Sequence, residues 1–178
     1  LPDAPAGTKG ISMFLVPKVL PGGEPNNLGC GAIEHKMGLR GSATCAMNYD
    51  GATGWLVGHE HKGLAAMFVM MNAARLAVGV QGVAIAERAT QRALKYAQER
   101  RQGRAAGAKE MSPIIDHPDI RRMLLTMRVL TLAARGICMA TAAATDLSHQ
   151  AEDADTRTRA ADRVALLTPV AKASATAV

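Results

Sequence analysis

The chain has 178 residues, 48% hydrophobic, 20% charged and only 3% aromatic, which is ordinary for a soluble globular protein long enough to bury a core. Leu, Val, Ala and Met dominate the apolar residues, and this mixture is more typical of packed helices than of a β-sandwich. The net charge of +6 suits binding to nucleic acid, an anionic membrane or phosphate-rich cofactors. No basic arm of five or six like charges occurs, which disfavours nucleic acid, and no uninterrupted apolar run reaches the roughly 18 residues of a membrane span.

The first sixty residues predict short strands separated by turns. Apolar runs predict strands over residues 11–16, 32–36, 44–49 and 55–57. Glycine-rich stretches between the runs supply turn and loop residues, and Pro17 closes the first run.

After Gly63 the hydrophobic period becomes helical and stays so to about Arg101. Within this first helix, Gly79 and Gly82 lower helix propensity but allow close approach of a neighbouring helix. The helical spacing is carried by Leu64, Met67, Phe68, Met71, Ala74, Val78, Ile85, Ala89, Ala93 and Tyr96.

Two more helices follow. The second is predicted from about His117 to about Gln150, with Pro118 suited to the first turn, and Met123, Leu124, Met127, Leu130 and Ala134 on one face. An acidic connector over residues 152–155 precedes a third helix, which begins near Thr156 and continues past Pro169. Three long helices with short connections predict antiparallel neighbours, as in a bundle.

The cysteines and the chain ends give two further expectations. Cys30, Cys45 and Cys138 are widely spaced and form no CxxC motif, which favours reduced thiols in a cytoplasmic protein. The chain begins at Leu1 without an initiator Met and stops at Val178 inside an alanine-rich pattern, so we expect a segment of a longer polypeptide.

Four segments in order resemble the FAD-dependent acyl-CoA dehydrogenase family. They are residues 10–17 (GISMFLVP), residues 35–42 (HKMGLRGS), residues 63–75 at the start of the first long helix, and residues 96–100 (YAQER) at its end. The resemblance covers essentially the whole chain. The stretch 48–58 (NYDGATGWLVG) resembles the larger branch of the family that includes 3-methylmercaptopropionyl-CoA dehydrogenase.

This resemblance implies an α+β fold. Residues 1–60 would form the C-terminal part of a β-barrel-like middle domain, and residues 61–178 the first three helices of a C-terminal domain of four-helix-bundle type. It also implies fatty acid metabolism: α,β-dehydrogenation of an acyl-CoA thioester, with a carboxylate removing the α-proton and hydride passing to FAD. Homo-oligomers, dimers or tetramers, would share the FAD sites, and an acceptor such as electron transfer flavoprotein would take the electrons.

The family resemblance places substrate-side residues early in the first helix. Arg75 matches an arginine near the active site that positions the base and the substrate, although it could instead pair with a carboxylate in the bundle, since an unpaired charge there is costly. Asn72 matches a polar position lining the substrate cleft. Met71, with Met67 and Met70, lines the acyl tunnel or packs in the core.

Cofactor contacts are implied at the end of that helix. Arg100 matches the family arginine that reaches the FAD pyrophosphate of the neighbouring subunit, a task that suits a guanidinium, although a solvated helix end is the alternative. Gln102 falls at a polar FAD contact. The chain departs from the pattern where many members have Phe-Gly after this arginine, and it has His117-Pro118 in place of His-Gln, which puts the usual adenine contacts in doubt.

The catalytic base is expected downstream of Val178, so this chain contains no catalytic residue and would be inactive alone. A minority of the family places a glutamate immediately before the Arg75 position, and Ala74 excludes that arrangement here. No metal site is predicted, because His59-Glu60-His61 is more typical of a solvated turn. Three alternatives stay open: a non-catalytic flavin-binding relative with a basic DNA-binding surface, an acyl-CoA oxidase, and a plain helical scaffold.

Overall fold

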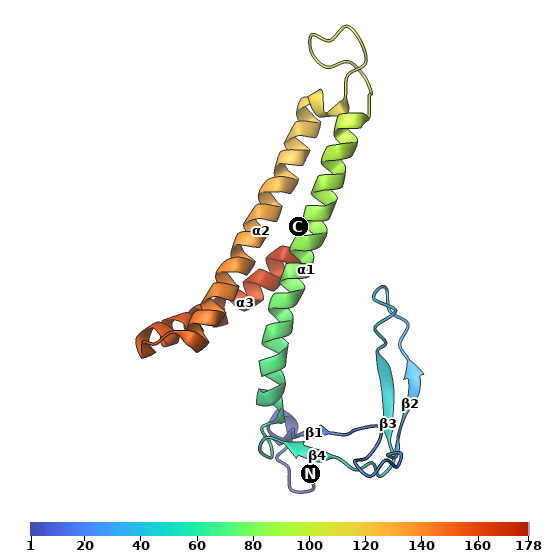
Figure 1. Cartoon of the computed structure of the whole chain (residues 1–178), viewed down its shortest axis with the longest axis vertical. Coiled ribbons are helices and arrows are strands. Elements are labelled where there is room, and N and C mark those ends of the chain that lie inside the picture. The colour runs from blue at the N-terminus through green and yellow to red at the C-terminus, as the bar shows by residue number, and fades with distance from the viewer. Residues whose placement is uncertain (178) are drawn as a thin grey trace. The chain divides into compact units, whose positions relative to one another are not determined.

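A computed structural model describes residues 1–177, which divide into two compact units, Leu1–Val69 and the helical unit from Met70 onward (Figure 1). The elements in chain order are η1 (Gly7–Gly10), β1 (Met13–Leu15), β2 (Leu28–Ile33), β3 (Cys45–Tyr49), β4 (Trp55–Val57), α1 (Gly63–Glu99), η2 (Ile114–Asp116), α2 (Pro118–Gln150) and α3 (Ala154–Thr176). The first unit, called the N-terminal unit below, holds all four strands and the first turns of α1.

The strands form two separate antiparallel pairs, β1 with β4 and β2 with β3. The predictions for 44–49 and 55–57 are confirmed to within a residue, and the first predicted strand is shortened to β1. The predicted strand at 32–36 was misplaced, because β2 begins at Leu28 and contains two glycines that obscured its apolar pattern. Neither sheet closes on itself, so the described residues do not confirm the barrel-like arrangement.

Asn26 ties together three segments of the N-terminal unit. Its side-chain Nδ2 donates to the carbonyl oxygens of Pro17 and Thr53, each at 2.8 Å. Its Oδ1 accepts from the backbone N–H groups of Thr53 at 2.9 Å and Asn27 at 3.0 Å. Asn26 is buried, and all the polar atoms of its side chain are satisfied. The side chain adds to the backbone bond from the Asn26 N–H to the Lys18 carbonyl, and it ties the Thr53 segment to both.

The three predicted helices are confirmed, with small shifts at their ends. α1 is a single helix of 37 residues, and α2 begins with Pro118 at its first position, as predicted. α3 begins two residues earlier than predicted, because the carboxylate of Asp153 accepts hydrogen bonds from the N–H and the hydroxyl of Thr156, each at 2.7 Å. These bonds lower the pKa of Asp153. Pro169 lies inside α3 without ending it.

The core of the helical unit consists mainly of small residues. The buried cluster is formed by Val83 from α1, Ala134 and Cys138 from α2, and Ala171 and Ala175 from α3. Larger apolar residues lie mostly outside it, and Met123 and Leu130, predicted on the packed face of α2, are 53% and 47% exposed. Small side chains let helix backbones approach closely, so the three helices meet mainly through small residues, with Leu76 and Ile137 packed against the cluster.

The buried threonines of the helical unit are satisfied within their own helices. The hydroxyls of Thr131, Thr141 and Thr168 donate to the carbonyl oxygens of the residues four positions earlier, at 2.7–2.8 Å. No desolvation cost is therefore left uncompensated at these positions.

An ion pair also joins α1 to α2. Arg135 Nη2 lies 2.8 Å from the carboxylate of Glu87. The Gln91 side chain, which donates to Glu87 at 2.8 Å, and the Arg135 guanidinium both lower the pKa of Glu87. Lys95 and Glu99 form an i,i+4 pair at 3.9 Å on the exposed face of α1. Such pairs are typical of an exposed helix face.

By length and composition, α1 and α2 could each cross a membrane. Long apolar helices that form the core of a helical domain satisfy the same criterion. The absence of a membrane span therefore stays a prediction.

The predicted role of the α1 glycines is confirmed, and it yields a stability prediction. A Cβ on Gly82 would overlap the carbonyl oxygen of Ala175 and lie 2.8 Å from its carbon, and both atoms are backbone. We expect Gly82→Ala to lower the free energy of unfolding by about 1–2 kcal/mol, since overpacking costs about 1–3 kcal/mol and the better helix propensity of Ala returns up to ~1 kcal/mol.

The matched control is Gly136→Ala in α2, where an added Cβ meets no atom within 4 Å. This substitution is expected to stabilise the protein by about 0.5–1 kcal/mol through helix propensity alone. Urea unfolding followed by far-ultraviolet circular dichroism compares the two. Equal stabilisation by both variants would contradict the close contact between α1 and α3.

Candidate functional site

The predicted site residues form two groups near opposite ends of α1. Met71, Asn72 and Arg75 lie in its first third, whereas Arg100 and Gln102 follow its last residue, Glu99. Asn72 and Arg100 are 28 positions apart, which corresponds to roughly 42 Å along a helix at about 1.5 Å per residue. The two groups therefore cannot contact the same small group within one chain.

The substrate-side group has a preformed polar contact. Arg75 Nη1 donates to Asn72 Oδ1 at 3.2 Å, so the amide helps to orient the guanidinium one turn along α1. Asn72 is exposed, and Met71 and Arg75 are half-buried on the same helix. Met70 is 59% exposed, which places it outside the packed core.

Arg100 and Gln102 lie at the start of a loop that is held by hydrogen bonds. The Arg100 N–H closes the last turn on the Tyr96 carbonyl at 2.9 Å, and its Nη2 donates to Gln102 Oε1 at 3.4 Å. The side chains of both residues are exposed. A guanidinium has five N–H donors, so most of those of Arg100 stay available for an anion.

Backbone pairing fixes this loop, which joins α1 to η2. The Gln102 N–H donates to the Ser112 carbonyl at 3.1 Å, and the Ser112 N–H donates to the Gly103 carbonyl at 3.0 Å. The ring Nε2 of His117 lies 2.8 Å from the Gln102 carbonyl oxygen. His117 matches the histidine of the family's His-Gln pair, and only the next residue, Pro118, differs. The His117 ring thus helps to hold the Gln102 backbone in place.

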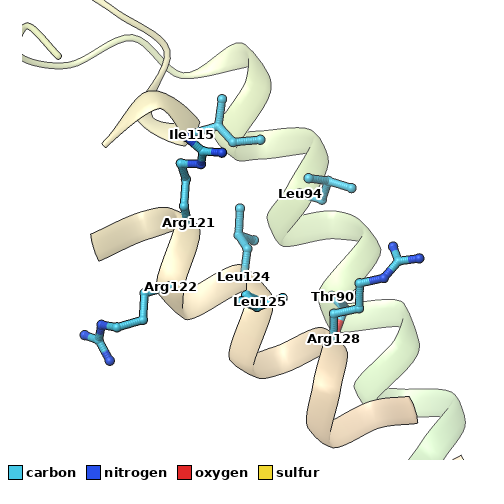
Figure 2. A pocket seen from close by; sticks show the side chains of 8 residues that line it. All are labelled: Thr90, Leu94, Ile115, Arg121, Arg122, Leu124, Leu125 and Arg128. Carbon is cyan, nitrogen blue, oxygen red and sulfur yellow. The ribbon is translucent and has the colours of Figure 1, made fainter. Parts of the chain in front are cut away.

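A pocket of about 450 Å³ lies at the same end of the helical unit, between the last turns of α1 and the first turns of α2. Leu124 extends into the space between these helices, and Leu94 lies on the neighbouring turn of α1 (Figure 2). Arg121 extends toward Ile115, and the Arg122 and Arg128 head groups point away from each other. The complete lining is Thr90, Leu94, Ile115, Arg121, Arg122, Leu124, Leu125 and Arg128.

Sequence reasoning missed this pocket, although a signal was present. Arg121 and Arg128 are seven positions apart, and Leu124 and Leu125 lie between them, which places cations beside an apolar surface on one side of α2. Together with Arg100, these residues make this end of the helical unit basic.

The His59-Glu60-His61 segment forms a turn before α1. Gly58 and His61 both have positive φ, 76° and 61°, and the His61 backbone N–H donates to Ser12 Oγ at 2.9 Å. Within residues 1–177, no three His, Cys, Asp or Glu side chains gather where they could hold a metal ion.

Comparisons with known proteins identify the family of the chain. The family model for the C-terminal domain of acyl-CoA dehydrogenases matches residues 61–176. The chain is 51% identical to 3-methylmercaptopropionyl-CoA dehydrogenase of Ruegeria pomeroyi, over 96% of the chain and 30% of that protein. It is 38% identical to a broad-specificity linear acyl-CoA dehydrogenase of Mycobacterium tuberculosis, over 76% of the chain and 25% of that protein.

Solved structures share the fold. ACDH-11 of Caenorhabditis elegans, in complex with C11-CoA, superposes with a TM-score of 0.80 at 24% identity, over 95% of this chain and 27% of that one. Butyryl-CoA dehydrogenase of Megasphaera elsdenii superposes with a TM-score of 0.62 at 21% identity, over 95% of this chain and 48% of that one. The chain spans less than a third of the two curated relatives above. The matched domain and the 51% identity establish that the chain belongs to the acyl-CoA dehydrogenase family.

Proposed function

We propose that this chain is part of a longer flavoenzyme that α,β-dehydrogenates an acyl-CoA thioester and binds FAD. The observation that carries the proposal is the 51% identity to a 3-methylmercaptopropionyl-CoA dehydrogenase across 96% of the chain. The longer polypeptide is called the intact protein below. The exposed apolar side chains of the strands, including Phe14, Ile33 and Trp55, are consistent with further β structure covering them.

The separation of the two groups supports a role for each in a different site. Asn72 and Arg75 would serve the substrate end of the site in their own subunit. Arg100 and Gln102, roughly 42 Å away along α1, would serve the FAD of a neighbouring subunit. A homo-oligomer, a dimer or a tetramer, is therefore part of the proposal.

The exposed donors at the end of α1 fit a phosphate group. Arg100 offers a planar fork that can bind two phosphate oxygens, and Gln102, bonded to it, fixes the direction of that fork. Bound FAD would supply the hydride acceptor. In this proposal, the residues of this chain bind and orient the substrate and the flavin. No carboxylate stands at the Ala74 position, and we propose that the catalytic base lies outside residues 1–178.

The remaining assignments are also proposals. The reduced state of Cys30, Cys45 and Cys138 favours a cytoplasmic protein. A separate electron acceptor, such as electron transfer flavoprotein, would reoxidise the flavin.

Product analysis tests the function. The intact protein is incubated with a panel of acyl-CoA thioesters and an artificial electron acceptor, and the thioesters are analysed by mass spectrometry. Loss of two hydrogens, with formation of the 2-enoyl-CoA, is the expected result. Peroxide formed in stoichiometric amount with air as the acceptor would instead assign an oxidase. No enoyl product with any thioester would contradict the proposal.

Arg75 is expected to act on turnover rather than on flavin content. In the intact protein, Arg75→Ala should lower kcat/KM by about 10–100-fold, the scale of one charge-assisted hydrogen bond of about 1.5–3 kcal/mol. Arg75→Lys, which keeps the charge, should recover part of the loss. Steady-state kinetics with the best acyl-CoA and the flavin-to-protein absorbance ratio are measured together. Unchanged kcat/KM in Arg75→Ala would contradict a role in turnover and assign Arg75 to the structure of the helical unit.

A further inference from the structure

The N-terminal unit contains two cysteines on adjacent strands that the proposed function does not use. Cys30 lies in β2, and Cys45 is the first residue of β3. In the antiparallel register, Cys30 pairs with Met47 and Cys45 pairs with Ile33. Cys45 and Met47 project from the same face of β3, because side chains alternate along a strand, so Cys30 and Cys45 are diagonal neighbours.

The two side chains lie close enough to affect each other. The pKa of Cys45 is raised first by its side-chain interaction with Cys30, and then by burial and by the charge on Cys30. Cys30 Sγ lies 3.3 Å from the Ala32 carbonyl oxygen and donates to it. Cys30 is exposed and Cys45 is partly exposed, whereas Cys138 is buried in the helical unit.

A β-bulge beside Cys30 would allow the two sulfur atoms to approach more closely than in a regular ladder. Diagonal neighbours in a regular ladder have Cα atoms about 7–8 Å apart, slightly beyond the usual span of a disulfide. The register shifts between Cys30 and Ala32, where Gly31 is the additional residue of β2. A bulge increases local twist, and glycine allows a wide range of backbone angles, so we expect a small backbone adjustment to bring the pair within range.

We propose that Cys30 and Cys45 are an oxidation site, at which a peroxide converts the dithiol into an intramolecular disulfide between β2 and β3. The exposed Cys30 sulfur attacks a peroxide oxygen, the O–O bond breaks, and Cys30 becomes a sulfenic acid with release of one water from hydrogen peroxide. The Cys45 sulfur then attacks the Cys30 sulfur, the S–O bond breaks, and a second water leaves. The two thiols lose two protons and two electrons, and the peroxide is reduced.

Trypsin separates the three cysteines, which makes the test direct. Cleavage after Lys18, Lys36, Arg40 and Lys62 places Cys30 in peptide 19–36 and Cys45 in peptide 41–62, and Cys138 falls in peptide 136–157. The full chain is treated with hydrogen peroxide, free thiols are alkylated under denaturing conditions, and the digest is analysed without reduction. We expect peptides 19–36 and 41–62 to appear linked, lighter by two hydrogens than their sum, and to separate on reduction.

A variant and an internal control test whether the link is specific to Cys30 and Cys45. Cys138, in the same sample, should remain alkylated as a free thiol. In Cys45→Ser the link should disappear, and labelling of a Cys30 sulfenic acid by dimedone should rise several-fold over the unsubstituted chain. Peptides 19–36 and 41–62 recovered unlinked, or each linked to a second copy of itself, would overturn the proposal. The result does not depend on the flavin or on turnover, so it stands apart from the proposed function.

Discussion

Arg100→Ala is expected to lower the FAD content of the intact protein, because the substitution removes the guanidinium proposed to bind the pyrophosphate. A charge-assisted hydrogen bond contributes about 1.5–3 kcal/mol, so the affinity should fall by about 10–100-fold. The fall should be larger if both arms of the fork bind phosphate. The dissociation constant for FAD, measured by fluorescence of the released flavin, gives the comparison.

The matched control is Arg104→Ala, in the exposed part of the same loop. It removes the same charge at almost the same place, but within residues 1–177 no hydrogen bond of its side chain fixes its direction. Arg104→Ala should keep its flavin. Equal losses in both variants would mean that general positive charge, rather than the Arg100 fork, attracts the cofactor. No loss in either would contradict the assignment of Arg100.

Asn26→Ala is expected to loosen the N-terminal unit, because it removes all four hydrogen bonds that tie residues 17, 27 and 53 to this side chain. Each bond contributes about 0.5–1.5 kcal/mol, so local opening should become easier by about 2–6 kcal/mol. Amide hydrogen exchange at Asn27 and Thr53 measures this opening, and fluorescence of Trp55 in β4 reports on the same unit.

Two further variants separate the cause. Asn27→Ala removes an exposed amide beside Asn26 and should leave exchange nearly unchanged. Asn26→Asp keeps the acceptor for the N–H groups of Asn27 and Thr53 but loses the donor to Pro17 and Thr53, so its effect should be intermediate. Equal exchange rates in Asn26→Ala and Asn27→Ala would contradict the proposed role of the buried side chain.

Helices were more predictable from the sequence than strands. Helical periodicity, Pro118 at a first position and glycines at helix contacts are local signals, and α1 and α2 end within a residue or two of their predicted ends. β2 was misplaced because Gly29 and Gly31 carry no side chain that could show alternation, and only pairing with β3 identifies the strand. The N-cap of α3 was also recognisable only in part, since Asp153 was assigned to a connector.

Tertiary contacts explain what the sequence did not reveal about the site. The family resemblance was enough to choose Arg75 and Arg100 as candidates, but the contacts of these residues with Asn72 and Gln102 depend on helix and loop geometry. The four bonds of Asn26 link residues far apart in sequence and leave no local pattern. The basic pocket beside Leu94 and Leu124 forms only where α1 and α2 meet.

A visible spectrum of the intact protein tests the central proposal most directly. The spectrum is recorded under anaerobic conditions, before and after each acyl-CoA thioester of a panel is added, with free CoA as the control. We predict a flavin band that is bleached by at least one thioester and unaffected by free CoA. A protein that carries no flavin, or a flavin that no thioester reduces, would contradict the assignment of this chain to an acyl-CoA-dehydrogenating flavoenzyme.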